Sequence, residues 1–349
     1  MKHYGGLTTF QLYLVAVAIA AFATACLTPV VRLTALRFGW LDHPTSSVKT
    51  HRVATPVLGG IAVWLGFAAS LIAMRFLTDF PTGTLYSLRA ILAGSALVFI
   101  LGVVDDLKKP HGLHFKPKFA VQLIAALLLI KFGIRIRFLA PDYLAAIVTA
   151  FWVVGITNAF NIIDIMDGLC SSQAAIAALG FLLIALPSEH IYVNFASAAI
   201  LGAALGFLPW NMSSGSKIFM GDSGSLVLGF VLSAVALGTD YTQVNPLGVY
   251  APLFILLVPM YDTLFVSALR MLRGHSPFLG SKDHFALRLE ALGYTRNQVV
   301  AIAAFAAAVL SLCAFLITQV STAWAMAIYV FVTLYVGGLS WRISRIRMT

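Results

Sequence analysis

Long apolar segments separated by short polar loops extend along the whole chain. A helix needs about 20 apolar residues to cross a bilayer, so the pattern predicts about eleven membrane-spanning helices, with ten as the alternative. The segments lie near residues 10–30, 57–74, 90–104, 119–130, 143–157, 172–187, 190–209, 224–239, 247–269, 297–319 and 321–341. We therefore expect an all-α, polytopic membrane helix bundle that forms a single domain over residues 1–349.

The composition agrees with this pattern. The 349 residues are 60% hydrophobic and 10% charged, whereas soluble domains carry about 25% charged residues. A mean hydropathy of +0.93 over the whole length excludes a water-soluble globule. The three cysteines, Cys26, Cys170 and Cys313, lie in or beside apolar runs without metal-ligand spacing, so neither a disulfide framework nor a zinc site is predicted.

The distribution of charge orients the chain in the membrane. Seventeen of the 23 lysines and arginines fall in one set of alternate loops and in the C-terminal tail. Because Lys and Arg in short loops stay cytoplasmic, the C-terminus is predicted to be cytoplasmic and the N-terminus outside. Nine of the 13 acidic residues fall on or near the same side. Membrane insertion does not require carboxylates there, so they indicate a separate function.

Two adjacent acids, Asp105 and Asp106, stand in GVVDDLKKP at the inner end of the third predicted span. Lys116 and Lys118 follow before the next apolar run. Acids are rare near the hydrocarbon and are often functional. The alternative is a solvated pair beside the membrane.

A second polar group, NAFNIIDIMDG, has Asn158, Asn161, Asp164 and Asp167 at every third position where the fifth span leaves the membrane. Neighbours at this spacing share a helix face. Amides can form a polar seam between helices, but such a seam has little use for two carboxylates. Metal or phosphate chemistry therefore fits this group better.

Asp222 lies in a glycine- and serine-rich turn, KIFMGDSGSLVLGF, just before the eighth span. Such a turn lets backbone N–H groups approach a phosphate, while the carboxylate reaches a cation bound to it. A simple helix N-cap is the alternative.

A further acid, Asp262, lies inside the ninth span and precedes a basic loop with Arg273 and His284. The loop could serve only as a topology determinant with a surface histidine. That alternative does not explain Asp262, which lies about two turns inside the last arginine of the span.

Convergence of these acids would require a cation. Two carboxylates about 5 Å apart repel by about 3 kcal/mol at an effective dielectric constant of about 20. Oxygen ligands near a phosphate are typical of Mg²⁺, which keeps several waters and bridges to substrate phosphates. The sequence thus predicts a magnesium-dependent reaction on a phosphorylated substrate at the cytoplasmic membrane surface.

Several motifs occur in order between about residue 30 and residue 300. They are HxxxxPxxGG (His51, Pro56, Gly59, Gly60), the paired acids with a downstream lysine, NxxNxxDxxDG, LGFLPWN followed by IFMGDSGS, and SPF with a later histidine. In these motifs the chain resembles the polyprenyl-phosphate N-acetylhexosamine-1-phosphate transferases, which belong to glycosyltransferase family 4.

The resemblance implies ten or eleven helices in the cell inner (plasma) membrane, with the active site on the cytoplasmic face. It implies Mg²⁺, with Mn²⁺ as an alternative, and transfer of a sugar-1-phosphate from a UDP-sugar to undecaprenyl phosphate with release of UMP. The product would start a lipid-linked envelope glycan such as lipopolysaccharide O-antigen. A homodimer is compatible with this expectation, and no nucleic-acid partner is expected.

The same resemblance implies the roles of individual residues. Catalytic roles fall to Asp105, Asp106, Asp222 and His284, and magnesium ligation to Asp222, Asp105, Asp106 and Asn161. Substrate contacts fall to Lys116, Asn158, Asn161, Asp164, Asp167, Asn211, Phe219, His51 and Arg273. Within this set Lys116 would face the lipid phosphate, Phe219 would stack on uracil, and His284 would meet the sugar-phosphate. Covalent attack by an Asp and deprotonation of the lipid phosphate remain two open mechanisms.

Two departures from the family pattern bear on the donor. Ile165 follows Asp164 where relatives carry glycine, so this turn is expected to avoid positive φ. Only His284 stands where relatives carry several histidines. The lack of a triple-histidine run favours UDP-GlcNAc over the phospho-MurNAc-pentapeptide branch of the family, which remains one alternative. An inactive homologue is a second, and a secondary transporter with ion sites at the bilayer midplane is a third.

Overall fold

The computed structural model describes residues 7–44, 53–81, 83–109, 112–187, 190–276 and 281–346. The chain is mostly helical, and each predicted apolar segment contains a helix. By length and composition, seven helices in the described ranges can cross a membrane, or eight if one bent pair counts as a single span. This agrees with a polytopic membrane bundle, while the count of about eleven spans and the orientation of the ends stay predictions.

The long helices follow the apolar segments closely. They are α1 (Thr9–Phe38), α2 (Gly60–Leu77), α3 (Thr84–Leu107), α4 (Phe115–Lys131), α5 (Asp142–Ile163), α6 (Leu169–Ala185), α7 (Ile191–Met212), α8 (Asp222–Gly238), α12 (Arg296–Gln319) and α13 (Thr322–Ser344). The ninth segment is broken into a 3₁₀ turn, Pro246–Tyr250, a short α9 (Ala251–Ile255), and α10 (Leu257–Leu272), with a bend of 70°.

Two small elements lie outside the predicted pattern. A two-residue antiparallel pair joins β1 (Leu41–Asp42) to β2 (Thr55–Pro56), and α11 (Phe285–Ala291) follows the basic loop. The all-α expectation misses the β pair because two residues are too few to produce a period-2 pattern.

Local sequence signals explain the limits of α1. Thr8 and Gln11 form a reciprocal capping box at its start, and Gly39 ends the helix in the left-handed conformation. The helix has 30 residues, a length of about 45 Å, which exceeds a hydrocarbon core of about 30 Å. In its C-terminal part, Arg32 donates to the backbone carbonyls of Gly215 and Lys217.

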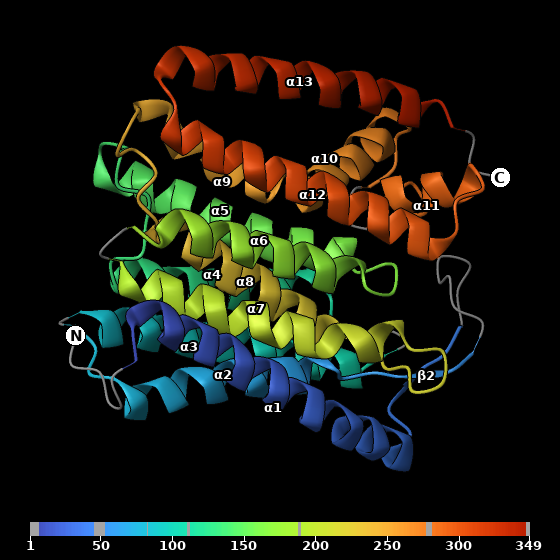
Figure 1. Ribbon diagram of the computed structural model, residues 1–349. Coiled ribbons are helices and arrows are strands. Elements are labelled where there is room, and N and C mark those ends of the chain that lie inside the picture. The colour runs from blue at the N-terminus through green and yellow to red at the C-terminus, as the bar shows by residue number, and fades with distance from the viewer. Residues whose placement is uncertain are drawn as a thin grey trace.

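The centre of the bundle is formed by α7 and α8. Helix α7 packs on α1 and α6, and α8 packs on α3 and α5. Nearly every side chain of α8 is buried, whereas α13 lies at the edge of the bundle (Figure 1).

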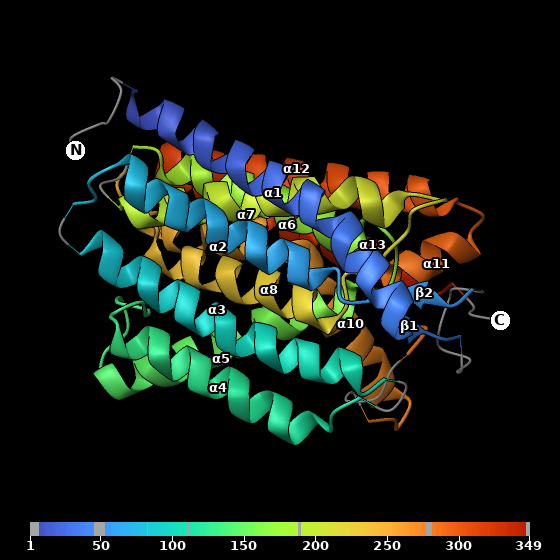
Figure 2. The ribbon, with the colours of Figure 1, turned by 90° about the horizontal axis from the view of Figure 1, so that it is seen from below.

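The helices run alongside one another, so each loop lies at one of two ends of the bundle. In Figures 1 and 2 the β1–β2 pair, α11 and the end of α13 share one end, and α1 begins at the other. The starts of α4 and α8 lie at the first end together with the ends of α3 and α5, which is where the acidic motifs stand.

Candidate active site

A cavity of about 1530 Å³ opens where these helix ends meet. Its walls come from α4, α5, α10, the turn after α5 and the segment before α8. Predicted site residues that line it are Asn158, Asn161, Asp164, Asp167, Asn211, Phe219, Asp222 and His284. Segments far apart in the sequence thus bring polar side chains to one place.

Lys118 bridges Asp222, which lines this cavity with it, to Asp105, which lies behind the wall. Its Nζ donates to Asp105 Oδ2 at 2.7 Å and to Asp222 Oδ2 at 2.8 Å. One ammonium group of α4 thereby joins the end of α3 to the start of α8. The side chain of Asp222 is 16% exposed and that of Asp105 is 4% exposed, so Asp222 is the carboxylate that is more accessible from the cavity.

Asp106 has a different environment from its neighbour. Its fully buried carboxylate accepts hydrogen bonds from the backbone N–H groups of Asp222 and Ser223, both at 3.0 Å. It also forms an ion pair with Lys109 at 2.7 Å. Gly221, at the N-cap position of α8, has no side chain to do this. Asp106 therefore caps α8 from α3 and fixes the position of Asp222.

The glycines of two motifs allow close backbone contact beside this cap. A Cβ on Gly60 would lie 2.1 Å from the backbone nitrogen of Gly224, and one on Gly221 would lie 2.4 Å from Asp106 Oδ2. Gly60 N–H also donates to the carbonyl of Met220 at 2.8 Å. The start of α2 thus lies directly against the start of α8. His51, at the head of the first motif, lies outside the described residues.

The two asparagines of the second motif connect helices. The amide of Asn158 pairs with that of Gln122 in α4, at 2.5 and 3.3 Å, and Asn161 Nδ2 donates to Ser225 Oγ of α8 at 3.0 Å. These amide contacts form a polar seam between helices, which the sequence offered as the alternative to metal or phosphate chemistry. Both residues also line the cavity, so a seam and a site wall coincide.

The two acids of that motif lie beyond the helix. Helix α5 ends at Ile163, and Asp164 and Asp167 therefore lie in the turn before α6 and not on the predicted helix face. Asp167 forms an ion pair with Lys217. In this turn Gly168 has a positive φ of 79°, whereas Ile165 does not have a positive φ. This agrees with the expectation that a turn with isoleucine in place of glycine avoids positive φ at that position.

Burial governs the ionisation of Asp164. Loss of hydration raises the pKa of its carboxyl to about 7, while the positive charge of Lys109 acts in the opposite direction. The carboxylates of Asp222, Asp167 and Asp106 add to the increase in pKa. A neighbouring cation or a bound substrate would therefore change the charge of Asp164 near neutral pH.

Asn211 and Phe219 complete this wall. Asn211 accepts the N–H of Gly168 at 2.6 Å and donates to the carbonyl of Ile218 at 3.0 Å, which ties the end of α7 to both segments. Lys217 Nζ lies 5.0 Å from the centre of the Phe219 ring. A cation and an aromatic face are therefore adjacent at the cavity wall.

A buried acid–histidine pair forms the opposite part of the site. His284 Nδ1 lies 2.7 Å from Asp262 Oδ2, and the other carboxylate oxygen accepts the N–H of Phe285 at 3.0 Å. Asp262 is fully buried in α10. A carboxylate at Nδ1 fixes the orientation of the imidazole and leaves Nε2 for the cavity. The sequence signal for Asp262 was its place inside an apolar span.

Two predicted substrate residues do not line the cavity in the described structure. Lys116 is exposed in the first turn of α4, and Arg273 pairs with Asp283 at 2.8 Å with a half-exposed side chain. Residues two apart on a helix point about 200° away from each other. Only one of the paired lysines can therefore face the acids, and that one is Lys118.

The donors present fit a hydrated magnesium ion. Within the described ranges no group of three or more His, Cys, Asp or Glu side chains is arranged as a ready metal site. Magnesium, however, usually takes only one or two carboxylates and keeps several waters. Asp222 supplies such a carboxylate and Asn161 an amide oxygen, and both residues line the cavity. Asp105 and Asp106 do not line it, and both oxygens of each already accept hydrogen bonds, those of Asp105 from the Leu113 N–H and from Lys118.

Comparisons with known proteins give the family. Residues 88–240 match glycosyl transferase family 4. A probable undecaprenyl-phosphate N-acetylglucosaminyl 1-phosphate transferase of Bacillus subtilis is 30% identical over 327 residues, which cover 91% of this chain and 88% of that protein. A decaprenyl-phosphate N-acetylglucosaminephosphotransferase of Mycolicibacterium smegmatis is 30% identical over 80% of this chain and 76% of its own length.

A more partial match is a phospho-N-acetylmuramoyl-pentapeptide-transferase of Desulforudis audaxviator, 32% identical over 65% of this chain and 76% of that protein. The chain belongs to glycosyl transferase family 4. The resemblance found from the motifs is thereby confirmed.

The raised pKa of Asp164 predicts a pH-dependent effect of Asp164→Asn on stability. The pKa of Asp164 in the folded protein, about 7, exceeds the ordinary aspartate value of 3.8, so ionisation destabilises the native protein as pH rises between these values. Without divalent cations, Asn should stabilise the protein increasingly from about pH 4 to about pH 7 and then by a constant amount. Thermal unfolding in detergent measures this, and an effect independent of pH would contradict it.

Proposed function

We propose that this protein transfers N-acetylglucosamine-1-phosphate from UDP-GlcNAc to undecaprenyl phosphate, in a magnesium-dependent reaction that releases UMP. The observation that carries this proposal is the bridge of Lys118 between Asp105 and Asp222 at the cavity wall. Phosphoryl transfer needs positioning and neutralisation of negative charge more than any other contribution from the protein. Ammonium groups and metal-binding carboxylates side by side provide both.

The lipid phosphate would bind near Asp105 and Lys118. We expect this end of the bundle to lie at the membrane surface, where a phosphate can reach Lys118 while its chain stays in the lipid. When Lys118 contacts this phosphate, one of the two carboxylates that it bridges becomes available as an oxygen ligand or proton acceptor. Covalent attack by an aspartate and direct attack by the lipid phosphate both use these residues.

The nucleotide would occupy the wall formed by Phe219, Lys217 and Asp167. Phe219 offers a flat apolar face for uracil, and Lys217 offers a positive charge for the diphosphate. His284, oriented by Asp262, would face the sugar-phosphate. In this arrangement the diphosphate would lie between Lys217 and the acid cluster.

In the overall reaction an oxygen of the lipid phosphate bonds to the phosphorus that carries the sugar. The phosphoanhydride bond to UMP breaks, and UMP leaves with the electron pair of that bond. Asp222, with Asp105 or Asn161, would hold a magnesium ion, which would supply neutralisation of the diphosphate charge.

We further propose that this site faces the cytoplasm of the plasma membrane and that the product starts a lipid-linked envelope glycan. The excess of lysine and arginine in the loops at this end supports that orientation. A secondary transporter is a weaker candidate because its coupling sites would lie at the middle of the spans, whereas the acids gather at helix ends. The single histidine favours GlcNAc over a MurNAc-pentapeptide donor.

The function is tested by measuring UMP release from purified protein with undecaprenyl phosphate, Mg²⁺ and a panel of UDP-sugars. UDP-GlcNAc should be the best donor, and EDTA should abolish turnover. Asp222→Asn should lower kcat by about 100-fold or more, as expected for lost stabilisation of a charged transition state. Asp142→Asn, an exposed acid at the other end of α5, serves as the control. Turnover in EDTA, or a normal rate of Asp222→Asn, would refute the proposal.

The two lysines of the α3–α4 region allow a matched comparison. Lys118→Gln should lower kcat/KM by about 100-fold, because it removes the charge between Asp105 and Asp222. Lys116→Gln should keep the wild-type value, since its side chain is exposed outside the cavity. The same turnover assay measures both variants, with thermal unfolding to check their folding. Equal losses of kcat/KM in the two variants would contradict the specific role proposed for Lys118.

A further inference from the structure

A second cavity, of about 520 Å³, lies at the opposite end of the bundle from the acid cluster. It is formed by the loop after α4, the end of α8 and the start of α9. Helix α8 begins at Asp222 and ends at Gly238, so its 17 residues separate the two cavities by about 25 Å. This cavity takes no part in the transfer chemistry described above.

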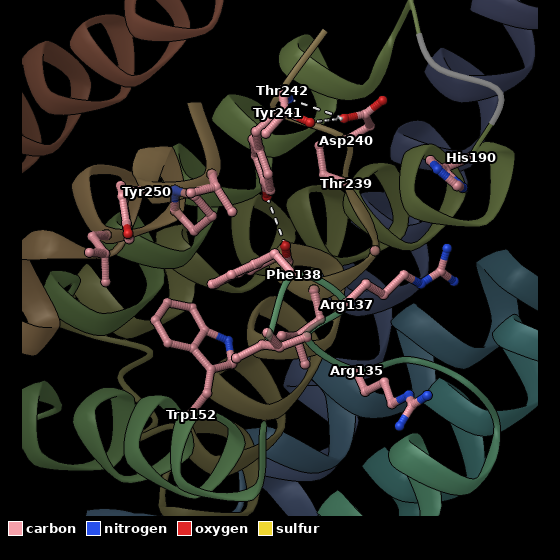
Figure 3. Close-up of a pocket in the computed structure, with 17 residues that line it drawn as sticks. Arg135, Arg137, Phe138, Trp152, His190, Thr239, Asp240, Tyr241, Thr242 and Tyr250 are labelled. Atoms are coloured by element: carbon pink, nitrogen blue, oxygen red, sulfur yellow. Dashed lines mark hydrogen bonds between the residues drawn. The ribbon is translucent and has the colours of Figure 1, made fainter. Parts of the chain in front are cut away.

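Basic side chains form one side of this cavity. Figure 3 shows Arg135, Arg137 and His190 on the same side of the view. Arg135 has a 3.3 Å ion pair with Asp142, whose side chain is 83% exposed. Arg137 has no hydrogen bond or ion pair with any residue in the described ranges. An exposed guanidinium at a cavity mouth is therefore available to an anion.

Among the described residues that line this cavity the one acid is Asp240, and it forms no ion pair with these arginines. Asp240 Oδ1 accepts the backbone N–H and the hydroxyl of Thr242, both at 3.1 Å, within its own turn. Asp142 and Asp240 formally balance the two guanidinium groups, but the Asp142 carboxylate that pairs with Arg135 is 83% exposed. Arg137 is left without a paired carboxylate within the described ranges.

Aromatic rings form the other side. The ring N–H of Trp152 donates to the backbone carbonyl of Ser233 at 3.2 Å, and the hydroxyl of Tyr241 donates to the backbone carbonyl of Ala236 at 3.0 Å. Their polar atoms are thereby used inside the protein, and their ring carbons remain for the cavity. Phe138 and Tyr250 are 58% and 46% exposed beside them. The wall opposite the cations is therefore apolar and partly exposed.

A site with cations on one side and exposed aromatic rings on the other matches an amphiphile with an anionic head. The membrane-insertion rule concentrates cations at the other end of the bundle, so it does not explain Arg135 and Arg137 here. Aromatic rings of this kind are typical of the membrane–water interface, and the guanidinium group of arginine binds phosphate oxygens through paired N–H donors.

We propose that this cavity binds the phosphate of an anionic phospholipid between Arg135 and Arg137, with the acyl chains along Phe138 and Tyr250. The ligand is a component of the surrounding bilayer at the end opposite the active site. The site does not depend on the identity of the sugar donor or on the metal.

Native mass spectrometry of the delipidated full chain in detergent tests this proposal, with titration by phosphatidylglycerol and by phosphatidylcholine. Wild-type protein should bind phosphatidylglycerol more tightly. The double variant Arg135→Ala/Arg137→Ala should bind it about 30-fold more weakly, at about 1 kcal/mol for each arginine. The control is Arg75→Ala/Arg89→Ala, two exposed arginines at the same end of the bundle but outside the cavity, and it should bind as the wild type does.

Three results would overturn the proposal. They are equal binding of the two lipids, an equal loss in the control variant, and displacement of phosphatidylglycerol by millimolar inorganic phosphate, which would indicate a free-anion site. Arg137→Ala alone keeps the test valid if the double variant fails to fold, because removal of the Arg137 side chain leaves no described partner unpaired. This single variant should bind phosphatidylglycerol about fivefold more weakly with unchanged thermal unfolding and transferase turnover.

Discussion

The structure depends on the neutralisation of three carboxylates by two ammonium groups at the start of α8. Asp105, Asp106 and Asp222 stand close together, and Lys109 and Lys118 lie among them. Without these cations, each pair of acids would repel by about 3 kcal/mol at a separation of about 5 Å. The ion pairs join α3, α4 and α8, so the charges that we propose for the chemistry also hold these helices together.

The adjacent acids divide two tasks between them. Asp106 caps α8 from a neighbouring helix and has little capacity left for a ligand, while Asp105 shares Lys118 with Asp222 at the cavity. The glycines at the starts of α2 and α8 let the two backbones approach, which holds this cap in place. A rigid frame of this kind suits phosphoryl transfer, where placement of charge does most of the catalytic work.

Much of this arrangement could be predicted from the sequence because apolar length defines the helices and the acids recur at helix ends on one predicted side. The choice between Lys116 and Lys118 could not, since it depends on the rotational position of α4 against α3. The capping role of Asp106 needs the tertiary contact with α8, and the pairing of Asp262 with His284 needs the bend before α10. These features arise from packing between distant segments, which local pattern does not encode.

A double-mutant cycle between Lys118→Met and Asp222→Asn tests the central claim most directly. If the ammonium group and the carboxylate form one unit, the free-energy changes of unfolding should deviate from additivity by more than about 1 kcal/mol. The matched cycle of Lys116→Met with Asp222→Asn should be additive within about 0.5 kcal/mol. Additivity in the Lys118 cycle would contradict the account.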